Sequence, residues 1–226
     1  MSSYLITGVP RGIGFEFLRQ ISADPNNTVV GLVRDKATTD KKVAELNRQN
    51  IHIVQADLTD YDSLKKSVDE VSPIVNGALG YVIANAGYIS SWSAYDPLSV
   101  FLSSGFADDE LTTGFAIDVA GPYTISKAAM NTAVAKYSAE YAESGVLFMS
   151  IAPGAVEVGQ DKDITPHQIE KGMALVAKFA RYAPNFRGRT TPEDSVKSMM
   201  SVMNGASLES GHGGCFVSQS GNKQWL

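Results

Sequence analysis

Short, almost wholly apolar runs alternate with amphipathic stretches from one end of the chain to the other. The apolar runs are the length of strands and lack apolar–polar alternation, which is typical of parallel strands covered on both faces. The pattern predicts strands over residues 4–7, 28–33, 52–56, 80–84, 100–103, 146–151 and 215–218. It predicts helices over residues 12–22, 38–49, 62–71, 123–142, 166–182 and 192–203. Strands that alternate with helices indicate an α/β fold built from parallel crossover units.

Composition favours one ordinary globular domain. The 226 residues are enough for one substantial core, so we expect a single domain over residues 1–226. The apolar runs are too short to span a membrane, and no secretory signal precedes the first strand. The single cysteine, Cys215, leaves no intrachain disulfide and favours a reducing, cytoplasmic location. A net charge of -5 argues against a nucleic-acid partner, and the three histidines have no metal-ligand spacing, so no metal site is predicted.

A glycine-rich turn joins the first predicted strand to the first helix, in the run Thr7-Gly-Val-Pro-Arg-Gly-Ile-Gly14. Glycines permit a tight turn and close approach of a ligand to the backbone, and the start of a helix attracts phosphate. The position favours a dinucleotide site over a plain turn.

Two arginines bear on which dinucleotide is bound. Arg11 lies in the turn, and Arg34 directly follows the second strand, where an acidic residue would otherwise bind the ribose 2′-hydroxyl. These cations favour the 2′-phosphate of NADP, although Asp35 leaves NAD as an alternative. Asp57, after the third strand, is a candidate for the adenine amino group or for a helix cap.

Tyr123 and Lys127 lie four residues apart in a stretch that favours helix, so their side chains share one face. A nearby ammonium favours the phenolate, and we therefore expect the pKa of Tyr123 to be lowered from about 10. A proton donor to a carbonyl needs such tuning. The alternative is an ordinary helix with a packed tyrosine and a solvated lysine.

Taken in order, these motifs resemble the short-chain dehydrogenase/reductase family, and most closely its fungal ketoreductases. The resemblance covers nearly the whole chain and adds Asn85-Ala86-Gly87, the pair Ser103-Ser104 and Pro153-Gly154 to the motifs above. It implies a Rossmann-type doubly wound parallel sheet. Catalytic roles would fall to Ser104, Tyr123 and Lys127. NADP (NADPH), with NAD less favoured, would be bound by Gly8, Arg11, Gly12, Ile13, Gly14, Arg34, Asp57, Asn85, Ala86, Gly87, Tyr123, Lys127, Pro153, Gly154 and Val156.

The chain departs from the family between Gly87 and Ser103. Family members have some forty or more residues there, including a long helix with a catalytic Asn, but here the interval is Tyr88 to Leu102 and contains no Asn. We expect this crossover helix to be shortened or missing, and one face of the fourth and fifth strands to be poorly covered. The usual family dimer interface is then in question, although a homo-oligomer remains compatible.

Two other departures concern the substrate side of the fold. Val158 stands where the family often has a Thr that contacts the nicotinamide carboxamide, so a side-chain hydrogen bond is lost. Residues 160–190 correspond to the family's substrate lid, with amphipathic packing as the alternative.

The leading hypothesis is an NADP-dependent reductase of a ketone, with Tyr123 as proton donor and an aromatic or polyketide-like small molecule as substrate. Two alternatives stay open. One is a dinucleotide-binding protein of the same fold with little or no reductase activity. The other is a non-redox isomerase or dehydratase that uses Tyr123 as an acid or base.

Overall fold

The computed structural model describes residues 1–88, 121–159, 165–182, 186 and 188–224. The chain divides into two compact units, and each is described by itself. The first contains residues 1–87, 156–158 and 191–197, and the second contains 88–155, 159–190 and 198–226. Whether residues 1–226 act as one domain, with a lid over 160–190, stays a prediction.

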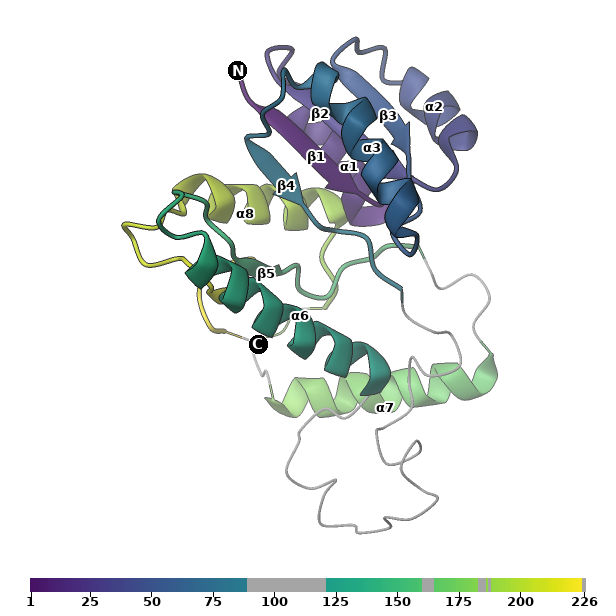
Figure 1. Cartoon of the computed structure of the whole chain (residues 1–226). Coiled ribbons are helices and arrows are strands. Elements are labelled where there is room, and N and C mark those ends of the chain that lie inside the picture. Colours follow the sequence, from purple (N-terminus) through teal and green to yellow (C-terminus); the bar gives the residue numbers. More distant parts are fainter. Residues whose placement is uncertain (89–120, 160–164, 183–185, 187, 225–226) are drawn as a thin grey trace. The chain divides into compact units, whose positions relative to one another are not determined.

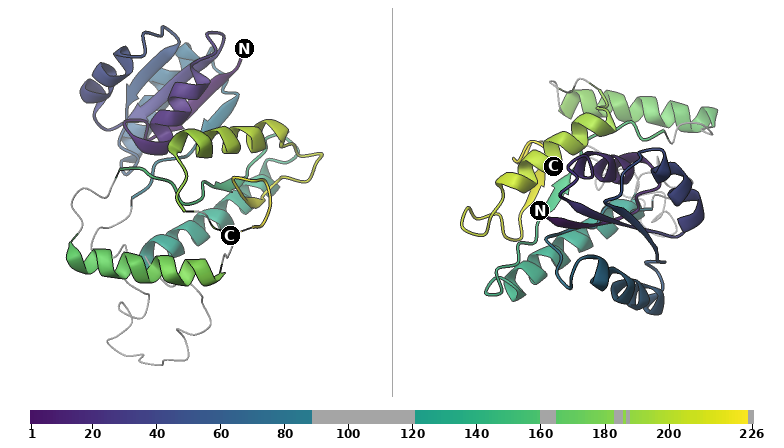
Figure 2. Two further views of the ribbon diagram at one scale, coloured as in Figure 1. Left: turned by 180° about the vertical axis from the view of Figure 1, so that it is seen from behind. Right: turned by 90° about the horizontal axis from the view of Figure 1, so that it is seen from above.

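The first unit is a parallel sheet with helices on both faces (Figure 1). The order of its four strands is β3-β2-β1-β4. Helices α1 and α2 lie on one face, and α3 lies on the other (Figure 2). The elements are β1 Ser3–Thr7, α1 Gly12–Ile21, β2 Thr28–Val33, α2 Lys36–Ala44, β3 Ile51–Gln55, α3 Tyr61–Ile74 and β4 Tyr81–Ile83.

The order of the strands makes β1 the switch point of the sheet. The chain moves outward from β1 to β2 and β3, and then returns across the sheet to place β4 on the other side of β1. This is the doubly wound arrangement that the sequence predicted. Tyr4 of β1 and Tyr81 of β4 are register partners, and their rings stack with centroids 4.6 Å apart. The stack therefore fixes β4 against β1.

Strand β2 is covered on both faces, as its apolar sequence predicted. Five of its six residues are buried. Val30 and Leu32 pack into a core cluster with Val54 of β3 and Val71 of α3. Since successive strand residues point to opposite faces, Val29, which is fully buried, belongs to the α1 face.

The second unit contains α6 Gly121–Glu140, β5 Ser150–Ala152, α7 Pro166–Tyr182, β6 Phe216–Ser218 and the C-terminal part of α8, which spans Pro192–Gly205. Strands β5 and β6 form a parallel pair. Tyr137 of α6 and Tyr141, the residue directly after this helix, pack around Phe148, with ring centroids 5.7 and 5.9 Å from it. This cluster fixes α6 against the segment that leads into β5.

Several expected boundaries need correction. Helix α2 ends at Ala44 rather than at residue 49, because Asn47 takes the left-handed conformation (φ 49°) that terminates a helix. The strand expected at 146 begins at Ser150, where pairing with Phe216 of β6 starts. The expected strand at 100–103 and the shortened crossover lie outside the described residues.

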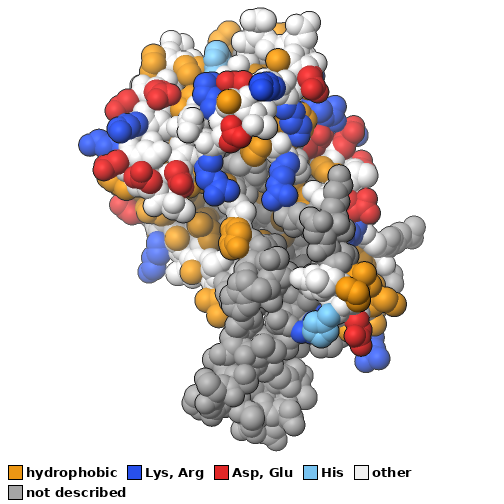
Figure 3. Space-filling view, turned by 90° about the vertical axis from the view of Figure 1, so that its right-hand side faces the viewer, with side chains coloured by type: hydrophobic (Ala, Val, Ile, Leu, Met, Phe, Trp, Pro, Cys, Tyr) orange, Lys and Arg blue, Asp and Glu red, His pale blue; other side chains and the backbone are white. Residues whose placement is uncertain are grey.

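The sequence predicted that one face of the fourth and fifth strands is poorly covered, and the structure describes the fourth strand, β4. Val82, the central residue of β4, is 62 % exposed, and β4 is an edge strand of the described four-stranded sheet. On the face of the first unit seen in Figure 3, basic and acidic side chains are interspersed.

Among the described helices, none combines the length and the apolar character needed to cross a bilayer.

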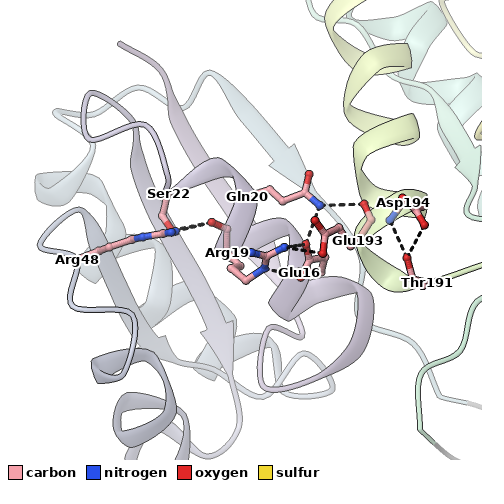
Figure 4. A network of polar contacts seen from close by, with 8 residues as sticks. All are labelled: Glu16, Arg19, Gln20, Ser22, Arg48, Thr191, Glu193 and Asp194. Carbon is pink, nitrogen blue, oxygen red and sulfur yellow. Dashed lines mark hydrogen bonds and ion pairs between the residues drawn. The ribbon is translucent and has the colours of Figure 1, made fainter.

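A buried carboxylate links α1 to the start of α8 within the first unit (Figure 4). Glu16 is only 8 % exposed, and its oxygens accept from Arg19 Nε (2.8 Å), Arg19 Nη2 (2.7 Å) and Gln20 Nε2 (2.7 Å). Gln20 also donates to the carbonyl of Glu193 at 2.9 Å. Burial alone would raise the pKa of Glu16, but the hydrogen bonds from Arg19 and Gln20 and the charge of Arg19 lower it overall.

We predict that Glu16→Ala lowers the free energy of unfolding by about 2 kcal/mol, because the guanidinium and amide lose a charged partner. Since the pKa of Glu16 is lower in the folded state, this contribution is present above the unfolded pKa near 4.5 and is lost as the pH falls through the folded value. Urea unfolding at pH 7 and below pH 4 would show the difference. Asp40→Ala, which breaks the exposed Lys36–Asp40 pair, should cost about 0.5 kcal/mol or less at both pH values.

Candidate active site

The glycine-rich turn has backbone angles that only glycine adopts easily. Gly8 and Gly12 have φ of 73° and 58°, in the left-handed region. The N–H of Gly8 donates to the carbonyl of Leu32 at 3.0 Å, so the turn begins beside the end of β2. It therefore lies at the carboxyl edge of the sheet, where open α/β sheets bind their ligands.

Gly14 permits a very close approach between α1 and the end of β1. A Cβ at this position would lie 2.2 Å from the carbonyl oxygen of Gly8 and 2.5 Å from Asn85 Nδ2. Both distances are far below van der Waals contact, and the nearest atom belongs to the backbone. A side chain at this position would force the helix away from the strand.

Asn85 joins the ends of the two strands at the switch point. Its Nδ2 donates to the carbonyls of Thr7 (3.0 Å) and Gly8 (3.3 Å). The N–H of Ala86 donates to Thr7 Oγ1 at 2.9 Å. The side chain of Asn85 therefore braces the glycine-rich turn from the β4 side, and Ala86 lies against Gly8, whose added Cβ would be 3.0 Å from the Ala86 Cα.

The start of α1 has no side-chain cap. Arg11 occupies the N-cap with extended backbone and makes no capping hydrogen bond, and the first turn carries no acidic residue. The first N–H groups of the helix and the positive end of its dipole are thus available for an anion. Ile13 lies within this first turn.

The charges beside the turn suit a phosphate better than a hydroxyl. Asp35 accepts from the N–H of Thr38 at 3.0 Å as the N-cap of α2, and hydrogen bonds from Thr38 lower its pKa. Its carboxylate is thus already used by the helix. Arg34 is exposed, and its charge adds to the lowering of the pKa of Asp57, which comes mainly from hydrogen bonds with Thr59.

Asp57 does not cap a helix, so this alternative reading of it is wrong. Its Oδ1 accepts from the N–H (2.9 Å) and Oγ1 (2.8 Å) of Thr59 in a tight turn. Asp60 caps α3 instead, by accepting from the N–H groups of Asp62 and Ser63. The adenine-binding role of Asp57 stays a prediction.

Lys42 is a candidate that the sequence did not reveal. Its Nζ donates to the carbonyl of Pro10 at 2.9 Å and lies 3.9 Å from the centre of the Phe15 ring. A third cation is thus held at the turn that carries Arg11. No local pattern in the sequence predicts this contact, because Lys42 of α2 lies 32 positions after Pro10 of the turn.

Tyr123 and Lys127 are both in the first half of α6, as predicted, with Lys127 Nζ 5.4 Å from the centre of the Tyr123 ring. The expected lowering of the tyrosine pKa is wrong for this geometry. Burial raises the pKa of Tyr123 above 10, because the phenolate would lose its hydration. The phenol therefore keeps its proton at neutral pH.

The other predicted residues are distributed over both units. Gly154 follows β5 with a φ of 79° and belongs with Pro153 to the second unit, whereas Val156 belongs to the first. Val158 lies against the glycine-rich turn, since a Cβ at Gly12 would be 3.4 Å from Val158 Cγ1. Gly87 follows Ala86 in the first unit. Ser104, with its neighbour Ser103, lies outside the described residues.

The switch-point turn and the strand order define a doubly wound α/β protein of the nucleotide-binding class. A family model described as short chain dehydrogenase matches residues 3–102. The chain is 45 % identical to the short chain dehydrogenase virK of Hypocrea virens and 40 % identical to the short-chain dehydrogenase/reductase iacC of Pestalotiopsis fici, with all of each chain covered. The chain therefore belongs to the short-chain dehydrogenase/reductase family of oxidoreductases.

A solved structure with the same fold is the NADPH-bound carbonyl reductase from chicken fatty liver. It covers 98 % of this chain with a TM-score of 0.69 and 22 % identity, and 93 % of its own chain is matched. The alignment with virK runs over 271 positions and this chain has 226 residues, so at least 45 positions face a gap. This chain is therefore shorter than virK, as a missing segment requires.

The described residues fit a nicotinamide dinucleotide. The glycines let α1 pack closely against the end of β1, and the uncapped start of α1 offers N–H donors to a diphosphate. Gly8, Gly12, Ile13 and Gly14 would hold the diphosphate, and Asn85 to Gly87 would border the adenosine ribose. When bound, the dinucleotide supplies or accepts a hydride.

We predict that Gly14→Ala abolishes dinucleotide binding or prevents folding, because its Cβ would meet the Gly8 carbonyl at 2.2 Å. Gly205→Ala is the matched control, since a Cβ there has no neighbour within 4 Å. Thermal unfolding with and without dinucleotide measures both effects. A Gly14→Ala protein with the stability and the ligand shift of the Gly205→Ala control would contradict the geometry.

Proposed function

We propose that the chain is an NADP-dependent reductase that converts a ketone to an alcohol. The observation that carries the proposal is the Tyr123–Lys127 pair on one face of α6, in a chain whose first unit has an intact dinucleotide turn. Membership of an oxidoreductase family supports hydride chemistry. The resemblance to fungal ketoreductases supports an aromatic or polyketide-like substrate, and the single cysteine supports a cytoplasmic location.

In this proposal Tyr123 donates a proton to the carbonyl oxygen as hydride reaches the carbonyl carbon. The phenol of Tyr123 carries the proton that this step needs, but burial raises its pKa, so the proton is held more tightly than in a donor tuned toward neutral pH. Lys127 would bind the nicotinamide ribose, and Ser104 would hold the substrate oxygen by a hydrogen bond.

The preference for NADP rests on charge. Arg11 and Arg34 flank the place where a ribose 2′-substituent would lie, and Lys42 adds a third cation at the turn. Asp35, the residue that would favour NAD, already caps α2. A 2′-phosphate would therefore meet positive charge.

A second function is favoured by the length of the chain. At least 45 aligned positions of virK have no counterpart, and the interval after Gly87 contains no Asn for a proton relay. The alternative is a protein that binds the dinucleotide and reduces little or nothing. NADPH binding with no NADPH oxidation across a broad panel of ketones would favour it.

We predict that Tyr123→Phe lowers kcat for ketone reduction by about 10²–10⁴-fold, the usual contribution of a general acid, and leaves the Kd for NADPH within about twofold. Tyr137→Phe is the matched control, because Tyr137 lies on the same helix, is half exposed and keeps its ring contact with Phe148 as Phe. Steady-state NADPH oxidation and a binding titration separate the two effects. Full turnover by Tyr123→Phe would exclude Tyr123 as the donor.

A further inference from the structure

Gln219 follows the carboxyl end of β6, directly beside the Pro153-Gly154 turn that follows β5. The two strands are parallel, with Ala152 paired to Ser218, so Gln219 is level with Pro153. Ligands of α/β proteins bind outside the carboxyl ends of parallel strands. Gln219 is thus in the second unit, together with Tyr123 and Lys127, at the strand ends where a ligand is expected.

The amide of Gln219 lies against Gly154. A Cβ at Gly154 would be 2.8 Å from Gln219 Nε2, 3.1 Å from Cδ and 3.3 Å from Oε1. Gly154 also has a φ of 79°. The absence of a side chain at Gly154 therefore makes room for a primary amide at this position.

The carbonyl oxygen of this amide has no partner. Gln219 Oε1 is a buried side-chain oxygen for which the described chain offers no hydrogen-bond donor, and no other buried side-chain atom among the described residues shares this condition. Burying an amide oxygen without a donor is unfavourable, and such groups in proteins usually mark a bound water, ion or ligand. A ligand that satisfies Oε1 has to present an N–H or O–H group.

We propose that Gln219 Oε1 accepts an N–H from the carboxamide of the nicotinamide ring and so fixes which face of the ring meets the substrate. This inference rests on the proposed function. A primary carboxamide has N–H donors and a carbonyl acceptor, and Gln219 carries the complementary pair on Oε1 and Nε2. Val158, in the position where the family often has a Thr, has no hydroxyl to offer the carboxamide.

The test compares two dinucleotides that differ at one group. NADPH has the carboxamide, and its reduced 3-acetylpyridine analogue has a methyl ketone with no N–H. The full chain and Gln219→Leu are titrated with both by calorimetry. We expect Gln219→Leu to weaken NADPH by about 5–10-fold, the value of one neutral hydrogen bond, and to change the Kd of the analogue by less than twofold.

Two further variants control for packing. Gln219→Glu keeps an oxygen that can accept the carboxamide N–H, although it loses the Nε2 donor, and should weaken NADPH less than Gln219→Leu does. Gln49→Leu removes an exposed glutamine in the loop after α2 and should leave both Kd values unchanged. Equal weakening of both dinucleotides by Gln219→Leu would show a packing role and overturn the proposal.

The outcomes distinguish this inference from the proposed function. If the unmodified chain binds NADPH and Gln219→Leu binds it equally well, the role of Gln219 is wrong and the reductase proposal stands. If the unmodified chain does not bind NADPH, both are wrong. If Gln219→Leu fails to fold, the test uses the unmodified chain alone. The proposal requires this chain to bind NADPH at least about fivefold tighter than the analogue. Equal Kd values for the two dinucleotides would overturn the proposal.

Discussion

The first unit depends on the near contact between the start of α1 and the end of β1. Gly14 lies so close to the Gly8 carbonyl that no side chain fits, and Asn85 brings β4 to the same point by donating to the carbonyls of Thr7 and Gly8. This contact sets the tilt of α1 and leaves its first N–H groups directed outward without a cap. The packing of the sheet and the capacity to hold a phosphate thus come from the same few atoms.

Much of the first unit could be predicted from the sequence, because its determinants are local. Apolar runs, the Thr7–Gly14 turn and the strand–helix alternation placed β1 to β4 and α1 to α3 within a few residues. The features that the sequence did not predict correctly depend on long-range contacts or on burial. The ends of α2 depend on the cap by Asp35 and the left-handed Asn47, the position of Lys42 depends on packing between two helices, and the raised pKa of Tyr123 depends on burial that no spacing reveals.

In the proposed function, dinucleotide binding and proton delivery would depend on different parts of the chain. The first unit has the turn, the switch point and the cations that a phosphorylated dinucleotide needs, and none of these depends on the interval after Gly87. In the proposed reaction, proton delivery would depend on Tyr123 and on Ser104, which lies outside the described residues. At least 45 aligned positions of virK have no counterpart in this chain. Binding and turnover are therefore separate claims.

A calorimetric titration of the full chain with NADPH and with NADH tests the central claim most directly, since it needs no substrate and no variant. Three cations beside the turn and an occupied Asp35 predict that NADPH binds at least tenfold tighter than NADH, with a preference that weakens as salt screens the 2′-phosphate. Tighter binding of NADH, or binding of neither dinucleotide, would contradict it.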